Sequence, residues 1–298
     1  MFEKFETRVL PGGADVRIRA RISTGSKPDA PPLLLLHGYP QTSAMWHRVA
    51  PALAENFTVV ATDLRGYGGS DKPAGGEGHE SYSKRAMAQD QVNVMTALGF
   101  DSFFLAGHDR GARVAHRLAV DHPQRVRKLA VLDIVPTRDM YRLTTMEFAR
   151  AYYHWFFLIQ PAPMPERMIG ADPEFYLRSK MGSTGGGGTS LELFSPEAME
   201  EYLQYFRDPE TLRATCEDYR AAATIDLKHD ELDLDRKITC PLLALWGGRG
   251  TIQRCFDALA LWRDRASGSV EGEALPGGHY LAEELPGEII ARFRAFFI

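Results

Sequence analysis

The stretch LAGHDRGARVAH, residues 105–116, decides how this chain folds. An apolar run leads into Gly-His-Asp-Arg-Gly at 107–111, and a segment of helical character follows. This is the spacing of the G-x-S-x-G elbow, which carries a nucleophile on a sharp turn between a strand and a helix. Asp109 stands where that pattern has serine, so the sequence predicts a carboxylate nucleophile. The alternative is an ordinary N-cap aspartate. The two glycines favour the elbow, because a tight crossing of strand and helix needs small residues.

Short apolar runs on both sides of this elbow are typical of buried parallel strands, because they end in glycine or a polar residue. Helical segments at 90–98 and 110–122 lie between them, and this alternation predicts a mostly parallel sheet with helices on both faces. The apolar runs are 33–38, 58–63, 103–108, 128–134 and 241–247. The fold class is therefore α/β.

The alternation stops at about residue 136, where an aromatic-rich and helical segment begins that has no clear strand. We interpret 137–225 as a helical cap inserted into a core domain that consists of 1–136 and 226–298. Open α/β sheets bind ligands at the carboxyl ends of their strands, and a lid is expected there. The run Gly185–Gly188 is either a mobile loop of this cap or a plain surface loop.

The composition excludes several classes of partner. The 298 residues carry a formal net charge of -4, which gives no reason to expect nucleic acid or an anionic membrane. The N-terminus has no apolar stretch of signal-peptide length, and no run approaches the ~20 apolar residues that span a bilayer. Cys216, Cys240 and Cys255 lack metal-like spacing and are typical of free thiols in a reducing compartment. We therefore expect a cytoplasmic protein.

A carboxylate nucleophile that turns over needs a base and an acid that orients the base. His279 follows two glycines in LPGGHYLAEE, just before the C-terminal helix, and none of the other histidines has that setting. Many serine hydrolases carry the acid in the stretch that corresponds to 243–251, but LALWGGRGT contains none. Asp133, at the end of the preceding strand, is the better candidate. Asp257 is a weaker one, because it is expected inside a helix.

The order Asp109, Asp133, His279 predicts attack on an sp3 carbon. A carboxylate that attacked an acyl group would only exchange one anhydride-like bond for another. Attack on an alkyl carbon yields an ester instead, which water activated by His279 can hydrolyse. The backbone N–H groups of Tyr39 and Arg110 are the expected oxyanion donors in that second step. Alkyl halides and epoxides are the substrate classes that fit this chemistry.

Two arginines bear on the choice between halide and epoxide. Arg110 follows the nucleophile directly and Arg113 lies one helical turn on, so their side chains can converge. Arginine binds carboxylates through two parallel hydrogen bonds, so the pair indicates a substrate that has a carboxylate of its own. A surface salt-bridge pair is the alternative.

The lid contributes a second group of candidates. His154, Trp155 and Tyr219 can each donate a hydrogen bond from a neutral group, which suits a leaving halide. Tyr152, Tyr153 and Tyr219 are the phenols that an epoxide hydrolase would need over the ring oxygen. Taken alone, the segment YYHWFF is more often plain core packing.

With these residues in view, the chain resembles the fluoroacetate (haloacetate) dehalogenases of the α/β-hydrolase superfamily. The matching stretches are LLLLHGYPQT, AGHDRGAR, VLDIVPT, YHWFFLIQPAP, CEDYRAAATID and LPGGH, from about residue 30 to the C-terminus. The resemblance implies an α/β-hydrolase fold, a homodimer, and neither cofactor nor metal. It assigns Asp109 as nucleophile, His279 as base, Asp133 as its acid, Arg110 and Arg113 as ligands of the substrate carboxylate, and His154, Trp155 and Tyr219 as ligands of the halide.

One stretch departs from that family. Its members carry a lid tryptophan near the position of Thr184, where this chain reads SKMGSTGGGG. Fluoride depends on a tight, dry pocket, so we expect acceptance of chloro- and bromoacetate, while the sequence leaves the preference between fluoride and the larger halides open. The predicted activity is hydrolysis of a small haloacid, haloacetate, to glycolate and halide. Epoxide hydrolysis and a preference for bulkier 2-haloacids are the alternatives, while a ligand-binding protein without turnover leaves the nucleophile, acid and base unexplained.

Overall fold

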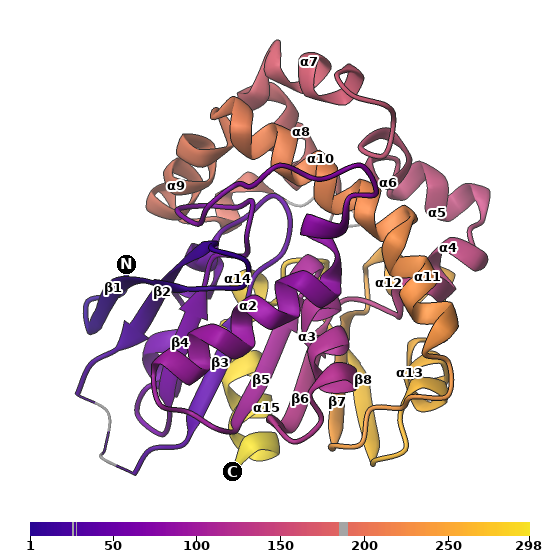
Figure 1. Ribbon diagram of the computed structural model, residues 1–298. Helices are drawn as coiled ribbons and strands as arrows, with labels where there is room; N and C mark the ends of the chain where they lie inside the picture. The colour runs from indigo at the N-terminus through magenta and orange to yellow at the C-terminus, as the bar shows by residue number, and fades with distance from the viewer. Residues whose placement is uncertain (26, 28, 185–189) are drawn as a thin grey trace.

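A mostly parallel sheet forms the centre of the computed structural model, which describes residues 1–298 except 26, 28 and 185–189 (Figure 1). Within the described residues the sheet has eight strands in the order β1-β2-β4-β3-β5-β6-β7-β8. β2 pairs antiparallel with β1 and β4, and the other neighbours are parallel. The strands are β1 (Phe5–Pro11), β2 (Arg17–Ser23), β3 (Pro32–Leu36), β4 (Thr58–Thr62), β5 (Phe103–His108), β6 (Val126–Leu132), β7 (Leu242–Gly247) and β8 (Val270–Leu275).

The five strands expected from apolar runs are all present, as β3 to β7. Every residue of β3 and β5 is buried, because helices cover both faces of a parallel sheet. β1, β2 and β8 were not expected from the sequence. β1 and β8 lie at the two edges and expose most of their residues at least partly, and β2 alternates arginine with apolar residues. None of the three therefore forms an apolar run.

Helices pack on both faces of this sheet. α2 and α3 lie in front of it in the view of Figure 1, and α15 lies behind it. The helices beside the sheet are α1 (Ala50–Leu53), α2 (Lys84–Ala97), α3 (Arg110–Asp121), α12 (Thr251–Cys255), α13 (Ala258–Arg265), α14 (Leu281–Glu284) and α15 (Pro286–Phe297). The α/β class, with a mostly parallel sheet between helices, is confirmed.

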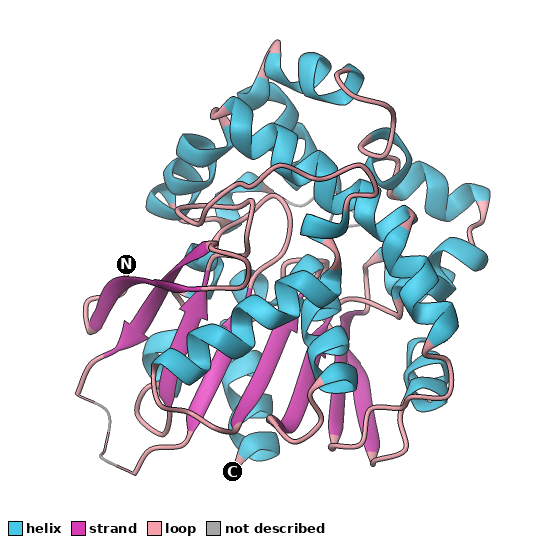
Figure 2. Cartoon of the chain, in the orientation of Figure 1, coloured by secondary structure: helices cyan, strands magenta, loops and turns pink. Residues whose placement is uncertain are grey.

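A second group of helices lies above the carboxyl ends of the parallel strands (Figure 2). These are α4 (Thr137–Arg142), α5 (Met146–Ala151), α6 (His154–Phe157), α7 (Met164–Gly170), α8 (Pro173–Thr184), α9 (Pro196–Phe206), α10 (Pro209–Ala223) and α11 (Ile225–Leu232). All but α11 fall within the range 137–225 expected for the cap, and the division into two domains stays a prediction. Gly185–Gly188 lies outside the described residues.

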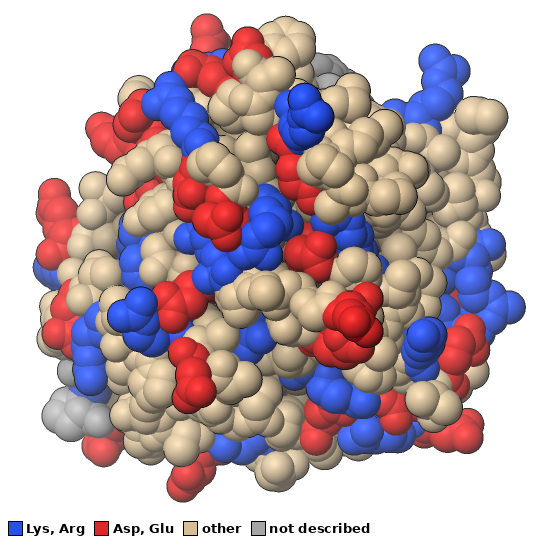
Figure 3. All heavy atoms as spheres, turned by 45° about the horizontal axis from the view of Figure 1, so that its top comes forward, with Lys and Arg blue, Asp and Glu red and all other residues tan. Residues whose placement is uncertain are grey.

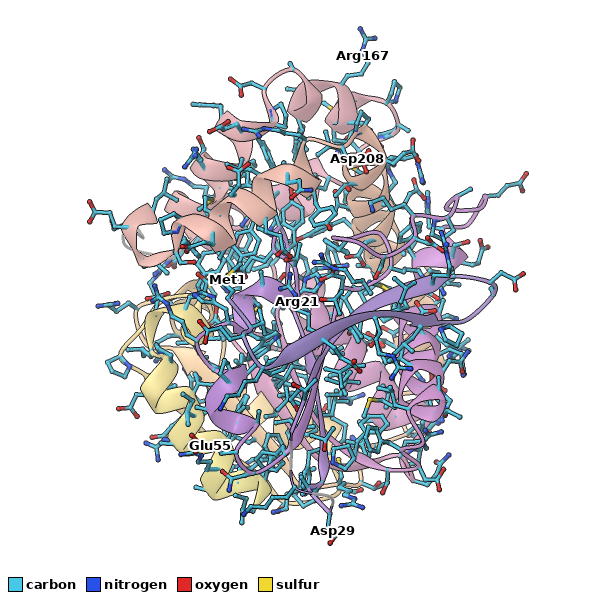
Figure 4. The ribbon with its side chains drawn as sticks, turned by 90° about the vertical axis from the view of Figure 1, so that its left-hand side faces the viewer. Met1, Arg21, Asp29, Glu55, Arg167 and Asp208 are labelled. Atoms are coloured by element: carbon cyan, nitrogen blue, oxygen red, sulfur yellow. The ribbon has the colours of Figure 1, made fainter. Side chains whose placement is uncertain are left out.

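Ion pairs with little exposure join α9 to the sheet. Glu201 of α9 accepts hydrogen bonds from Arg19 and Arg21 of β2 and from the Thr42 hydroxyl. Figure 4 labels Arg21 on its strand, just below the upper helices. The arginine and glutamate side chains are at most 14% exposed, so salt screens these pairs less than pairs at the surface. They help to hold α9 over the strand ends.

Acidic and basic side chains are interspersed over the face that Figure 3 shows, without an extended area of one sign. This distribution agrees with the small net charge of -4. No helix among the described residues combines the length and the apolar character that crossing a bilayer requires.

Candidate active site

Asp109 lies on the turn between β5 and α3, with φ 47° and ψ -114°. A positive φ is strained for a residue with a side chain, and such strain is frequent at active sites. A Cβ added to Gly107 would lie 2.6 Å from the backbone of Ala112, and one added to Gly111 would lie 2.4 Å from the carbonyl oxygen of His37. The two glycines therefore permit the close crossing expected of an elbow. The Asp109 carboxylate makes no capping hydrogen bond to α3, unlike an ordinary N-cap.

The carboxylate of Asp109 is buried and held from two sides. Its Oδ1 accepts a 3.0 Å hydrogen bond from the N–H of Tyr39, and its Oδ2 lies 4.0 Å from Nε2 of His279. In the described part of the chain, the N–H of Arg110, the other expected oxyanion donor, makes no hydrogen bond to this carboxylate. Burial acts to raise the pKa of Asp109, but nearby histidine and arginine charges, His279 foremost, outweigh it and hold the pKa at about 2. The carboxylate is therefore ionised at neutral pH.

Asp133 and His279 lie together beside Asp109. Oδ2 of Asp133 is 2.6 Å from Nδ1 of His279, and Oδ1 accepts a 2.8 Å hydrogen bond from the N–H of Gly247. Both side chains are at most 3% exposed. Burial raises the pKa of Asp133, against the opposing effect of His279. This arrangement leaves Nε2 of the imidazole on the side of Asp109.

Asp257, the weaker candidate for the orienting acid, has another role. It was expected inside a helix, but it is the N-cap of α13 and accepts a 3.0 Å hydrogen bond from the N–H of Ala260. A short polar side chain at this position satisfies a backbone donor that the helix leaves unpaired. This capping bond accounts for Asp257 without a catalytic role.

Both arginines are buried, at 0% and 2% exposure for Arg110 and Arg113, so the surface-pair alternative is wrong. Nε and Nη2 of Arg110 donate to the carboxylate of Asp218 at 2.8 and 2.7 Å. Nη1 of Arg113 donates to the carbonyl of Val135 and to the hydroxyl of Thr137. Among the described residues, Nη1 of Arg110 and Nε of Arg113 are buried without a hydrogen-bond partner. Such donors are normally satisfied, so both can serve a bound anion.

The three expected halide donors form one buried cluster. Nδ1 of His154, Nε1 of Trp155 and the hydroxyl of Tyr219 are buried and make no hydrogen bond with the described residues. The Tyr219 ring centroid lies 5.7 Å from that of His154 and 6.3 Å from that of Trp155. Burial lowers the pKa of His154 and raises that of Tyr219, so both are neutral at pH 7.

The arginines connect this cluster to Asp109. The guanidinium carbon of Arg110 lies 4.2 Å from the Tyr219 ring centroid, and that of Arg113 lies 4.5 Å from the Trp155 ring. The charges of both arginines act on Asp109. The Asp109 carboxylate, two guanidinium groups and three neutral donors thus belong to one buried site. Such a site can bind an anionic substrate and stabilise an anionic leaving group.

A family model described as the α/β hydrolase fold matches residues 31–286. The chain is an α/β hydrolase. The match begins just before β3 and ends in the last helix, and it includes the elbow, Asp133 and His279. The fold expected from the sequence resemblance is therefore confirmed.

This α/β hydrolase is similar to proteins of two activities. It is 47% identical over 296 residues to a fluoroacetate dehalogenase from Burkholderia sp., covering 99% of this chain and 95% of the relative. It is 35% identical to a soluble epoxide hydrolase from Corynebacterium sp., covering 89% of this chain and 90% of the relative. A solved structure of an α/β hydrolase from Nostoc sp. superposes with a TM-score of 0.95 at 56% identity, covering 100% of this chain and 99% of the other. The resemblance to fluoroacetate dehalogenases, hydrolases of carbon–halide bonds, is confirmed.

The three phenols considered for epoxide chemistry lie in different places in this hydrolase. The hydroxyl of Tyr152 is 3.3 Å from Nδ1 of His279, and the guanidinium of Arg110 lies over the ring of Tyr219. Tyr153 is 43% exposed and lies outside the buried cluster. Only part of the expected phenol set is therefore present around Asp109.

Sequence reasoning missed two charged residues of this site. Asp218, which binds Arg110, lies 108 positions away in the chain, and nothing in the local sequence pairs the two. Lys180 of α8 is 2% exposed, and its charge acts on His154. Burial, against the attraction of Asp109, lowers the pKa of Lys180 to about 7. The motif CEDYR, in which Asp218 stands next to Tyr219, was the one signal in the sequence that could have indicated Asp218.

The stretch near Thr184 without an aromatic residue continues into 185–189, outside the described residues.

Proposed function

We propose that this protein hydrolyses haloacetates, fluoro-, chloro- or bromoacetate, to glycolate and halide. The observation that carries the proposal is the buried cluster of His154, Trp155 and Tyr219, whose donors find no partner among the described residues. A leaving halide needs donors of this kind, and a neutral set stabilises an anion without binding it irreversibly. The 47% identity to the Burkholderia fluoroacetate dehalogenase supports the same substrate class.

In the first step the Asp109 carboxylate displaces halide from the α-carbon. An oxygen–carbon bond forms, the carbon–halogen bond breaks with its electrons, and a chiral carbon is inverted. Arg110 and Arg113 bind the substrate carboxylate and offset the repulsion between two anions. The depressed pKa of Asp109, about 2, supports this role because the nucleophile needs no base to remove a proton.

In the second step water attacks the Asp109 carboxyl carbon of the ester. His279 takes the proton of that water, and Asp133 stabilises the imidazolium that forms. The Tyr39 N–H, 3.0 Å from Oδ1, stabilises the oxyanion. Glycolate leaves with the proton that His279 returns to its hydroxyl oxygen, the second proton of the water passes to solvent, and the carboxylate is regenerated with one oxygen from water.

Within this proposal we expect chloride and bromide to be released faster than fluoride. The carbon–fluorine bond is stronger, and the lid stretch 179–188 contains no aromatic residue. A lid without that ring also favours acceptance of bulkier 2-haloacids. We further expect a homodimer from the family resemblance, which light scattering at several concentrations tests.

Epoxide hydrolysis is the second candidate. It is supported by the 35% identity to the Corynebacterium soluble epoxide hydrolase and by the buried hydroxyl of Tyr219. The exposure of Tyr153 weighs against it, and the paired arginines have no role in a neutral epoxide. Turnover of styrene oxide without turnover of haloacetate would establish it.

The test is halide release, measured by ion chromatography from fluoroacetate and chloroacetate in parallel. Wild type and Asp109→Asn are compared, because Asn keeps the shape of the elbow and removes the nucleophilic charge. Halide release by wild type that is lost in the variant supports the proposal. Chloride release alone supports general haloacid hydrolysis, and release of neither halide overturns the dehalogenase proposal. Single turnover in oxygen-18 water should label Asp109 before product.

A further inference from the structure

Arg110 is held from behind by a charged network of buried residues. Asp218 accepts hydrogen bonds from Nε and Nη2 of Arg110 at 2.8 and 2.7 Å. The Asp218 carbonyl accepts a further bond, 2.9 Å, from Nη2. Tyr67 donates its hydroxyl to Asp218 at 2.6 Å, and the Lys84 ammonium is hydrogen-bonded to the same carboxylate. The Lys84, Asp218 and Arg110 side chains are at most 4% exposed.

This network fixes the orientation of the guanidinium group. A guanidinium is a planar fork, and two parallel bonds to one carboxylate define its plane and its rotation. Because Nε and Nη2 of Arg110 are used by Asp218, Nη1 is the nitrogen that remains, and it is buried without a partner among the described residues. Nη1 is therefore the nitrogen of Arg110 that remains to bind the substrate carboxylate in the proposed site.

The network also connects the upper helices to the core. Asp218 and Tyr219 are adjacent on α10, whereas Arg110 begins α3 and Lys84 begins α2. The Arg110 guanidinium lies 4.2 Å from the Tyr219 ring centroid. One turn of α10 thus holds Arg110, the proposed ligand of the substrate carboxylate, through Asp218. The same turn supplies a proposed halide donor through Tyr219.

We propose that Asp218 is a positioning residue, which directs Nη1 of Arg110 at the substrate carboxylate, so that docking of α10 completes the carboxylate and halide sites together. This inference rests on the proposed function, since it assumes a substrate that has a carboxylate. Asp218 also balances charge: with Asp226, whose carboxylate is 3.4 Å from Lys84, it offsets Arg110 and Lys84. Orientation and charge balance are separable by experiment.

Arg113 provides an internal comparison. Its Nη1 is held by the neutral groups of Val135 and Thr137, and no carboxylate contacts its guanidinium among the described residues. A change at Asp218 should therefore weaken the contact of Arg110 with the substrate carboxylate and leave that of Arg113 intact. Because one contact remains, we expect a partial loss of affinity for carboxylates.

The experiment compares Asp218→Asn with Lys84→Met/Asp218→Asn. Asparagine offers one acceptor oxygen in place of two, and the added Lys84→Met restores the net charge without restoring the paired bonds. KM and kcat for chloroacetate are measured together with the Kd of acetate by calorimetry. For both variants we expect KM and the acetate Kd to rise by roughly 10- to 100-fold, more than kcat falls. Recovery of wild-type values in the double variant would overturn positioning in favour of charge balance.

Two controls separate this effect from damage to the fold. Asp226→Asn removes a buried carboxylate that contacts Lys84 but makes no hydrogen bond to Arg110, and its KM should stay within about threefold of wild type. Tyr67→Phe loses only the hydroxyl contact to Asp218, and we expect a KM rise of roughly two- to fivefold. If Asp218→Asn does not fold, this milder variant decides, and an unchanged KM and acetate Kd overturn the inference.

The outcomes distinguish this inference from the proposed function. Wild type that releases no halide removes the proposed function, while acetate binding still reports on the placement of Arg110. Wild type that releases halide, together with Asp218→Asn that keeps KM and acetate affinity, removes only the inference.

Discussion

Nδ1 of His279 lies 2.6 Å from Oδ2 of Asp133, although 146 positions separate the two residues in the chain. Asp133 follows β6, His279 follows β8, and β7 lies between these strands in the sheet. The N–H of Gly247, at the end of β7, binds the other oxygen of Asp133 at 2.8 Å. Asp133 is thus fixed by the strand that separates it from His279, and Nε2 of His279 lies 4.0 Å from Oδ2 of Asp109.

The first prediction separates the two chemical steps. His279→Gln removes the base for ester hydrolysis and leaves the Asp109 carboxylate intact, so we expect one halide per site and then an ester on Asp109. Mass spectrometry of the peptide that contains Asp109, after incubation with chloroacetate, should find it heavier by one carboxymethyl group. Asp133→Asn should slow turnover by roughly 10²- to 10⁴-fold. Continued glycolate production by His279→Gln at the wild-type rate would contradict the assignment.

The second prediction concerns pH. Since the pKa of Asp109 is about 2, the nucleophile is ionised throughout the range from about pH 5 to about pH 9. Halide release in a single turnover of the wild type, in which His279 is present, should therefore have a nearly constant rate across this range when it is followed by rapid quench. A rate that rose with pH through this range would show that Asp109 is protonated in the free enzyme.

The third prediction concerns the halide donors. Trp155→Phe keeps a large ring beside Arg113 and removes the indole N–H. Fluoride is the poorest leaving group, so fluoride release should fall by roughly 100-fold and chloride release by less. Tyr219→Phe should act in the same direction. Ion chromatography at saturating substrate measures both, and equal losses for the two halides would argue against direct contact with the leaving group.

The fourth prediction concerns stability. Glu283 of α14 accepts hydrogen bonds from Gln41 and Tyr202, and burial raises its pKa from 4.5 to about 8. Between these two values the folded state holds a proton that the unfolded state releases, so this group's contribution to stability falls as pH rises through that window. A glutamine side chain does not titrate in this range. The free energy of unfolding of Glu283→Gln should therefore fall less than that of the wild type as pH rises.

Thermal unfolding at both ends of the window measures this effect. From pH 5 to pH 8.5, the Tm of the wild type should fall by about 5 °C more than that of Glu283→Gln. An identical pH dependence in the two proteins would mean that Glu283 titrates normally.

Much of the site could be predicted from the sequence, because its signals are local. Gly107, Asp109 and Gly111 specify the elbow because the close crossing of β5 and α3 leaves no room for a side chain at the two glycine positions. The chemistry of Trp155 and Tyr219 as donors follows from residue type alone. The apolar runs that became β3 to β7 have both faces covered, and so they were recognised. The edge strands were missed, because an edge needs no continuous apolar surface.

What the sequence determined by itself was therefore the elbow, the parallel core and the kinds of side chain available for chemistry. The tertiary structure decided which of these groups meet. Asp218 joins Arg110 across 108 positions, Asp133 rather than Asp257 meets His279, and Tyr153 faces outward while Tyr219 is buried. The physical reason is that such contacts depend on how elements far apart in the chain pack: α10 over the strand ends for Asp218, and the segments after β6 and β8 for Asp133 and His279. Packing depends on many side chains that are far apart in the chain, and a local sequence pattern does not contain that information.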